Sequence, residues 1–367
     1  MSNATRERRI EALTRACQDA GSELALFEEV SRRLRKLVPF DGAAWFATDP
    51  TTLLGTCAVR VENIDPGQCE TYWEREYLVE DTLLFRDVAR SAQGVGTLYD
   101  ATGNRPGRSA RYREYLAPQG YGDQLRAAFR LNGTTWGLLD LYRDRSATPF
   151  SDRECAQVKQ IAPVVAGALR AFASEARGTA VADHPGTALF DERGALFSLD
   201  DQAGQLFEEI GGPGWQRFPA SMTPVHAVVA RASAVAKGRD RGPATTRLRA
   251  VSGRWLALNA SRLHGSDGAA GPTAVTVEPA RPEQVAPIIM KAYVLTAREQ
   301  QVTRAVSRGL SSQEIAAELF LSTHTVRDYL KSIYEKVGVT TRGELVARLF
   351  AEHYLQGPDR GAELVEW

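Results

Sequence analysis

The strongest constraint on this sequence is a helix-start pattern that recurs near its C-terminus. Thr296, Ser311 and Thr341 are each followed three residues later by a glutamate. In such a capping box the hydroxyl accepts a hydrogen bond from a free backbone N–H, while the glutamate accepts one from the N–H of the capping residue. Ser322 can cap one more helix. The pattern therefore predicts four short helices within residues 295–354.

The third of these helices has an apolar face and a polar face. It is expected to follow a short turn at 320–322 and to end at Gly338, where a left-handed residue can cap it. Spacings of 4, 3 and 4 place four apolar residues on one stripe, namely Val326, Leu330, Ile333 and Val337. The other face carries His324, Arg327, Asp328, Lys331 and Glu335. Such a face suits DNA recognition, because arginine and lysine can donate to guanine or phosphate and aspartate can accept from cytosine.

This segment resembles the LuxR-type helix-turn-helix family. The matching runs are LTARE from residue 295, GLSSQEIA from 309, LSTHTVR from 321, IYEKVGV from 333 and RGEL from 342. The resemblance implies an all-α four-helix DNA-binding domain over residues 295–356. Its third helix would enter the major groove, and its fourth helix would pair two such domains.

The resemblance also assigns roles to individual residues. Base edges would be contacted by Arg327, Asp328 and Lys331, with His324 on the same exposed face. The DNA backbone would be contacted by Ser312, Gln313, Thr323, Thr325 and Lys336. Tyr329 stands where the family usually has histidine, so the phosphate contact of that position stays open.

Charge limits how such a domain can bind DNA. The chain has 45 lysines and arginines against 45 aspartates and glutamates, so binding must come from a local patch. Residues 288–356 hold nine basic and seven acidic side chains, a net charge of +2. A single domain of this charge should bind weakly, so we expect a homodimer on two half-sites about one turn (~10 bp) apart. The candidates for dimerisation are Leu345, Leu349 and Tyr354, although this edge could equally pack against the sensor domains.

The N-terminal part predicts an α+β domain. After a helical lead-in at residues 1–21, residues 22–173 hold an amphipathic helix, two apolar strands, a hairpin around Asn132-Gly133 and a long closing helix capped at Ser151. The runs FEEVSRRLRKLVPFDGAAWFATDP and DQLRAAFRLNGTTWGLLDLYRD resemble GAF sensory domains.

A second α+β domain is expected over residues 185–278, after a small and polar linker. Its order of strands and helices resembles a PAS-type sensor. Asp200-Asp201 imitates the acidic pair of a phosphoacceptor domain, but the later strands read as hairpins rather than parallel strands, so we exclude that function. Residues 264–272 are expected to form a flexible loop, 279–294 a linker helix and 357–367 a flexible tail.

Domains of these two kinds characteristically enclose a ligand pocket against the sheet. The candidates in the first domain are Trp45, Cys57, Trp73, Phe129 and Trp136, with Trp255 in the second. The alternative, that these residues are simply core, is favoured at each position. No metal site, cofactor site or catalytic motif is recognised, so neither a cofactor nor an enzyme is expected.

The sequence thus predicts a dimeric transcriptional regulator that binds double-stranded DNA under the control of its sensor domains. An unidentified small-molecule effector and RNA polymerase are possible further partners. The alternative is a protein-interaction regulator, in which the sensor domains bind a partner protein and DNA binding is secondary. No secretory signal or membrane span is recognised and the four cysteines form no disulfide framework, so a cytoplasmic location is expected.

Overall fold

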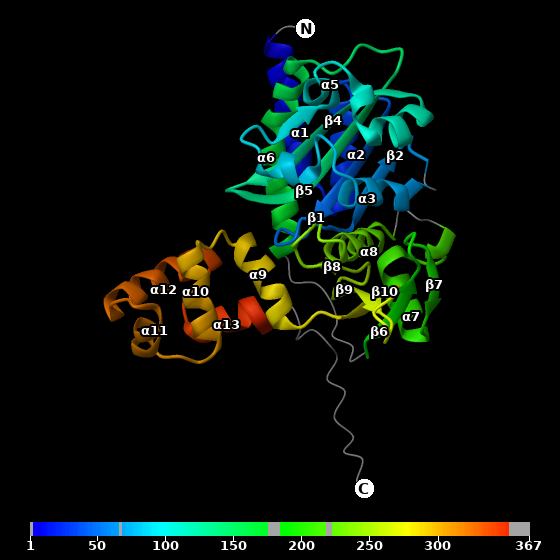
Figure 1. Ribbon diagram of the computed structural model, residues 1–367. Helices are drawn as coiled ribbons and strands as arrows, with labels where there is room; N and C mark the ends of the chain where they lie inside the picture. The colour runs from blue at the N-terminus through cyan, green and yellow to red at the C-terminus, as the bar shows by residue number, and fades with distance from the viewer. Residues whose placement is uncertain (1–2, 66–67, 175–183, 218–221, 352–367) are drawn as a thin grey trace.

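The computed structural model describes residues 3–65, 68–174, 184–217 and 222–351 (Figure 1). Two α+β domains and a smaller helical domain follow one another along the chain. The first domain lies at the top of Figure 1, the middle domain below it, and the helical domain beside the middle one. The expected multidomain fold class is therefore confirmed.

The first domain is built on an antiparallel sheet with the strand order β2-β1-β5-β4-β3. Its strands are β1 (Gly42–Thr48), β2 (Gly55–Glu62), β3 (Val95–Thr97), β4 (Tyr121–Leu131) and β5 (Thr134–Asp144). One face packs against α1 (Asn3–Asp19), α2 (Glu23–Leu34) and α6 (Asp152–Ser174). The other face is covered by α3 (Cys69–Tyr77), α4 (Phe85–Arg90), α5 (Leu98–Thr102) and the helical turns Pro106–Arg108, Tyr112–Leu116 and Ala117–Gln119.

The central hairpin forms where the sequence predicts it, but with one irregularity. Asn132 and Gly133 have φ angles of 50° and 76°, which a tight hairpin turn requires. Beyond the turn, Arg130 pairs with Thr135 whereas Phe129 pairs with Gly137, so Trp136 is an extra residue on β5. This β-bulge shifts the register by one residue.

The lead-in helix belongs to the first domain. In α1, Leu13 is fully buried and Cys17 is 3% exposed. Both lie in the same apolar cluster as α2 and α6. Burial raises the pKa of the Cys17 thiol to about 12, which agrees with a reduced structural cysteine.

The middle domain repeats the strand order of the first, as β7-β6-β10-β9-β8. Its elements are β6 (Gly186–Phe190), β7 (Leu196–Leu199), α7 (Asp201–Gly211), the helical turn Trp215–Arg217, α8 (Thr223–Ala236), β8 (Thr245–Arg249), β9 (Trp255–His264) and β10 (Ala270–Pro279). All strand pairs are antiparallel, so the exclusion of a phosphoacceptor domain is confirmed. The side chain of Asp200 instead caps α7. The loop expected at 264–272 is shorter than predicted, because Ala270 already pairs with His264.

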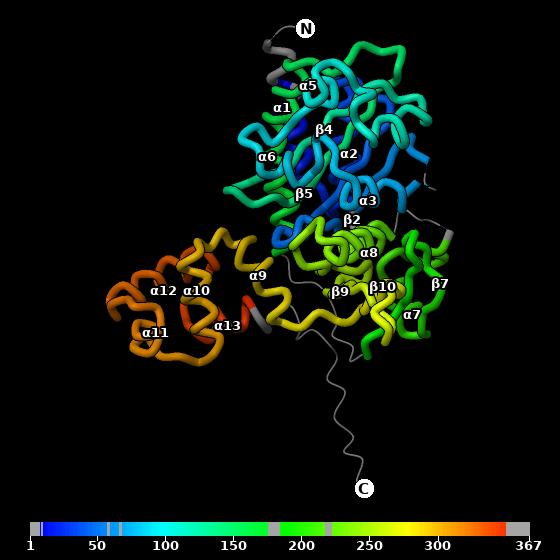
Figure 2. The backbone as a smooth tube through the Cα atoms, in the orientation of Figure 1, coloured from blue at the N-terminus to red at the C-terminus, as the bar shows by residue number. Residues whose placement is uncertain are grey.

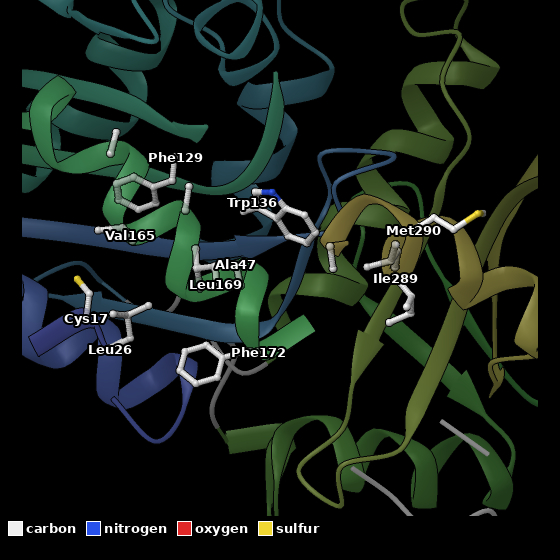
Figure 3. Packing of buried hydrophobic residues seen from close by; sticks show 14 of the residues in the cluster. Cys17, Leu26, Ala47, Phe129, Trp136, Val165, Leu169, Phe172, Ile289 and Met290 are labelled. Atoms are coloured by element: carbon white, nitrogen blue, oxygen red, sulfur yellow. The ribbon is translucent and has the colours of Figure 1, made fainter. Parts of the chain in front are cut away.

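The helical part begins with α9 (Pro282–Ala292), which occupies the expected linker. It continues with α10 (Ala297–Ser307), α11 (Ser312–Leu319), α12 (Thr323–Val337), α13 (Arg342–Val346) and the π-helical turn Ala347–Ala351. One apolar cluster runs from the first domain through α9 into the helical domain. Figure 3 shows Trp136, Leu169 and Phe172 of the first domain near Ile289 and Met290 of α9. The expected tail at 357–367 lies outside the described residues.

Among the described helices, none is both long and apolar enough to span a membrane.

Candidate nucleic-acid interface

The predicted capping boxes are all present in the helical domain. Thr296, Ser311 and Thr341 each accept a hydrogen bond from the backbone N–H three residues later, and the paired glutamate accepts one from the backbone N–H of the capping residue. Ser322 caps α12 by accepting from the N–H of Thr325. Gly338 ends α12 with a φ of 73°. These local bonds fix where each helix begins and ends.

The apolar stripe of α12 is buried against α10 and α11. Val326 and Ile333 are fully buried, and Leu330 and Val337 are at most 9% exposed. This stripe belongs to the same cluster as Val302 and Ile315 of the neighbouring helices. The polar face must therefore point to solvent, as the sequence predicts.

The base-contact candidates lie together on that exposed face. Arg327, Asp328 and Lys331 are all exposed, and His324 contacts Asp328 with 3.0 Å between Nδ1 and Oδ2. Within the described part of the chain, no hydrogen bond or ion pair engages Arg327 or Lys331. A shallow groove of about 410 Å³ runs beside both residues and is lined further by Tyr334 and Thr340. Two uncommitted cations beside a groove can donate to an incoming anion or base edge.

The backbone-contact candidates fall into two groups. Gln313 is exposed, and Ser312, Thr323 and Thr325 are half-buried in the first turns of α11 and α12. Lys336 differs, because its ammonium donates to both carboxylate oxygens of Glu299 at 2.6 and 2.8 Å. Lys336 is thus engaged within the protein, a role that the sequence did not indicate.

The buried side chain of Glu299 connects α10 to α12 by hydrogen bonds. Its side chain is 3% exposed and accepts from the Thr296 N–H, the Ser332 hydroxyl and Lys336. Burial alone would raise the pKa of this carboxyl, but the bonds from Lys336, Thr296 and Ser332 lower it to about 2. The capping glutamate therefore also positions the candidate recognition helix.

Replacing Glu299 with glutamine is expected to destabilise the helical domain by about 1.5–3 kcal/mol at pH 7, because Lys336 loses its charged acceptor. A lowered folded-state pKa stabilises the fold above the ordinary value of 4.5, and that contribution is lost as the pH falls toward about 2. Urea unfolding followed by circular dichroism at pH 7 and pH 3 should show the stability difference between wild type and E299Q narrowing at pH 3. The exposed Glu335→Gln on α12 is the control. An equal difference at both pH values would contradict this role of Glu299.

The predicted dimerisation edge is wrong for this arrangement of the chain. Leu345 is fully buried and Leu349 is 1% exposed, because α13 packs against α10 and the π-helical turn after it packs against α9. Arg348 Nε also donates to the hydroxyl of Tyr293 at 3.2 Å. Tyr354 lies outside the described residues. The edge therefore packs within the chain, and its observed neighbour is the linker helix α9.

The ligand-pocket candidates do not line one pocket. Trp45, Phe129 and Trp136 lie on the helix α2/α6 side of the first sheet, where the rings of Trp45 and Phe129 stack 6.0 Å apart. Trp73 lies in the cluster on the opposite side. Trp255, on β9, belongs to the same cluster as Trp45. The side chain of Cys57 is outside what the structure describes. The prediction of one shared pocket is therefore wrong, and the described candidates are core residues.

A buried cluster of charged and polar side chains around Arg126 was not predicted from the sequence. Arg126 Nη1 donates to Glu76 at 2.6 Å and its Nε donates to Asp140 at 3.0 Å. Asp140 also accepts from Tyr72 and Gln124. All five side chains are at most 5% exposed. Burial opposes the charge on Arg126, but Asp140 and Glu76 raise its pKa well above the ordinary value, so the guanidinium stays charged.

Comparison with known proteins identifies two of the domains. The model of bacterial regulatory proteins of the luxR family matches residues 293–349, and the GAF domain model matches residues 22–169. The regulatory protein NarL of Mycobacterium tuberculosis H37Rv, described as probable, is 37% identical over 73 residues, which is 20% of this chain and 32% of that protein. The transcriptional regulatory protein UhpA of Escherichia coli K12 is 45% identical over 56 residues, which is 15% of this chain and 29% of that protein. This chain thus spans about a third of the length of these curated relatives.

Solved structures match over more of the chain at low similarity. Escherichia coli SdiA covers 94% of this chain and 97% of its own, with 12% identity and a TM-score of 0.31. The VqsR LBD domain from Pseudomonas aeruginosa covers 46% of this chain and 96% of its own, with 16% identity and a TM-score of 0.30. From the family models and the helix geometry together, residues 293–349 are a LuxR-family helix-turn-helix domain and residues 22–169 are a GAF domain.

Proposed function

We propose that this protein is a transcriptional regulator that inserts α12 into the major groove of DNA. The observation that carries the proposal is the exposed face of α12, where Arg327 and Lys331 have no partner among the described residues. The matched relatives NarL and UhpA are named as transcriptional regulatory proteins, which supports the same function. Asp328 already has His324 as a neighbour on the same face, with 3.0 Å between Nδ1 and Oδ2.

The protein acts on DNA as a homodimer in this proposal. A net charge of +2 over residues 288–356 gives a single domain few phosphate contacts, and affinity for DNA depends strongly on their number. Two domains on paired half-sites would double these contacts. Since Leu345 and Leu349 are buried, the dimer surface lies elsewhere on the chain. Sedimentation of the full chain with and without its selected DNA would measure the stoichiometry, and one chain per site would contradict the proposal.

The sensor domains control DNA binding through α9. This helix contacts α6 of the GAF domain on one side and the last helical turn of the DNA-binding domain on the other. The middle domain acts as a PAS-like second sensor, supported by its antiparallel sheet of order β7-β6-β10-β9-β8 with helices between β7 and β8. Selection of bound sequences from a random DNA pool, repeated with metabolite extract, tests DNA binding and its control together.

Replacing Arg327 with alanine is expected to weaken binding of the selected DNA by about 1–3 kcal/mol and to relax the preference at one base pair. The reason is that an unpaired guanidinium on the groove-facing side can donate two hydrogen bonds to one guanine. The measurement is a repeated pool selection with the variant. Arg153→Ala, an exposed arginine at the start of α6 in the GAF domain, is the control. An unchanged preference at every position would contradict the role of Arg327.

Replacing Lys331 with alanine is expected to lower affinity evenly across sequences if its ammonium meets a phosphate. The slope of log affinity against log salt should then fall by about one. Fluorescence anisotropy at four salt concentrations measures this slope, again with Arg153→Ala as control. If both Arg327→Ala and Lys331→Ala bound DNA like wild type, the recognition face would be assigned wrongly.

A further inference from the structure

Outside the DNA-binding domain, five arginines line one cleft between the two sensor domains. The cleft has a volume of about 410 Å³ and lies where α3 and α4 of the GAF domain meet α8 and residues 238–242 of the middle domain. Figure 2 shows α3 and α8 next to each other. The arginines are Arg86, Arg90, Arg231, Arg239 and Arg241.

Three of these arginines have partners in the protein, and two of them, Arg231 and Arg239, bond across the domain boundary. Arg231 donates to the carbonyl of Thr52 at 2.5 Å and lies 3.3 Å from Asp240. Arg239 donates to the carbonyl of Leu78 across the domain boundary. Arg86 donates to both carboxylate oxygens of Glu80 at 3.0 Å. Arg86 and Arg231 therefore face carboxylates, and Arg239 is held by a backbone carbonyl.

The positive charges of the other two arginines, Arg90 and Arg241, are not paired with a carboxylate of any described residue. Both are exposed, and no hydrogen bond or ion pair joins either one to a described residue. The carboxylates that line the cleft cannot neutralise them, because Glu76 pairs with Arg126 at 2.6 Å and Asp240 faces Arg231. One arginine comes from the GAF domain and the other from the middle domain, so an anion held by both would bridge the two domains.

The shape and chemistry of the cleft select the kind of anion. Its volume falls in the range of small-molecule sites, which favour domain boundaries. The planar guanidinium matches the oxygens of a phosphate group with two parallel hydrogen bonds. Tyr77 and Phe85 also line the cleft and supply apolar wall for the rest of a ligand. We propose that this interdomain cleft binds a small phosphate-bearing anion through Arg90 and Arg241.

The test is calorimetric titration of the full chain, without DNA, with inorganic phosphate, pyrophosphate and ATP. Saturable binding of pyrophosphate or ATP is expected, and the double variant Arg90→Gln/Arg241→Gln should lower that affinity about tenfold or more, since charged hydrogen bonds are lost. Equal affinity for pyrophosphate and ATP would assign binding to the phosphates alone, whereas tighter ATP binding would include the apolar wall. Arg153→Gln, the exposed arginine on α6, is the matched control and should bind like wild type.

Three results would overturn the proposal. One is the lack of saturable binding by any of the three probes. Another is an equal loss of affinity in the Arg153→Gln control, which would show a general charge effect. The third is a loss of DNA affinity in the double variant without pyrophosphate binding, which would assign these arginines to nucleic acid. Because Arg90 and Arg241 have no described partners, the double variant should unfold at the wild-type temperature. The third result comes from a separate assay with the selected DNA. Failure of the calorimetric titration leaves the role of α12 untouched, since that titration contains no DNA.

Discussion

Replacing Arg126 with methionine is expected to destabilise the GAF domain by about 3–5 kcal/mol, because removing one partner leaves buried charges uncompensated. Arg126 is fully buried and bonds both Glu76 and Asp140. Methionine approximates the length of the side chain, so little of the loss would come from an empty cavity. Urea unfolding followed by tryptophan fluorescence measures the effect, since Trp45, Trp73 and Trp136 all lie in this domain.

The matched control is Arg130→Met, four residues further along the same strand. Arg130 donates only to backbone carbonyls, those of Ala89 and Ser91 among them, near the surface, so its loss should cost about 1 kcal/mol. Adding Asp140→Asn to Arg126→Met should recover part of the stability, because Glu76 then remains as the counter-charge of the buried Arg111, 3.8 Å away. Equal destabilisation by Arg126→Met and Arg130→Met would show that the buried charges do not stabilise the domain as inferred.

This cluster marks a limit of prediction from sequence. A regular hairpin closed by Asn132-Gly133 would place Arg126 opposite Leu139. The bulge at Trp136 shifts the register by one residue and places Arg126 opposite Asp140 instead. The local sequence does not predict the bulge, because the bulge depends on how the whole sheet packs between the helices on its two faces. For the same reason, the burial of Arg126 could not be predicted from the sequence.

The helical domain was predictable because its determinants are local. The capping boxes at Thr296, Ser311 and Thr341 and the stripe beginning at Val326 act within a few residues, so sequence alone placed α10 to α13 and the exposed face of α12. Contacts between distant segments escaped prediction. The apolar edge with Leu345 satisfied two hypotheses equally, and only the position of α9 decides between them.

The prediction that the aromatic residues line one shared pocket was wrong for a related reason. Adjacent strand residues point to opposite faces of a sheet, and Trp73 comes from a helix whose side of the sheet the sequence did not fix. Trp45 and Trp73 therefore lie in different layers. The strand order common to both sensor domains also depends on pairing between distant residues, and the short edge strand β3 at residues 95–97 was not predicted.

Replacing Ile289 with alanine is expected to loosen the docking of the DNA-binding domain on the GAF domain. Ile289 is fully buried in the cluster that joins both domains through α9, as Figure 3 shows. Burial of this kind is worth about 2–5 kcal/mol for an isoleucine reduced to alanine. Calorimetry should show the transition of the helical domain moving to lower temperature and separating from that of the GAF domain. Leu24→Ala, at a leucine that is 53% exposed, is the control and should leave both transitions in place.

The same variant separates docking from DNA recognition. The recognition face of α12 lies on the opposite side of its helix from the apolar stripe, which packs on α10 and α11. Ile289→Ala should therefore keep the wild-type affinity for the selected DNA while losing any response of that affinity to a sensor ligand, because α9 connects the two parts. If the variant lost DNA affinity to the same extent as Arg327→Ala, docking on α9 would itself be required to hold α12 in its binding geometry.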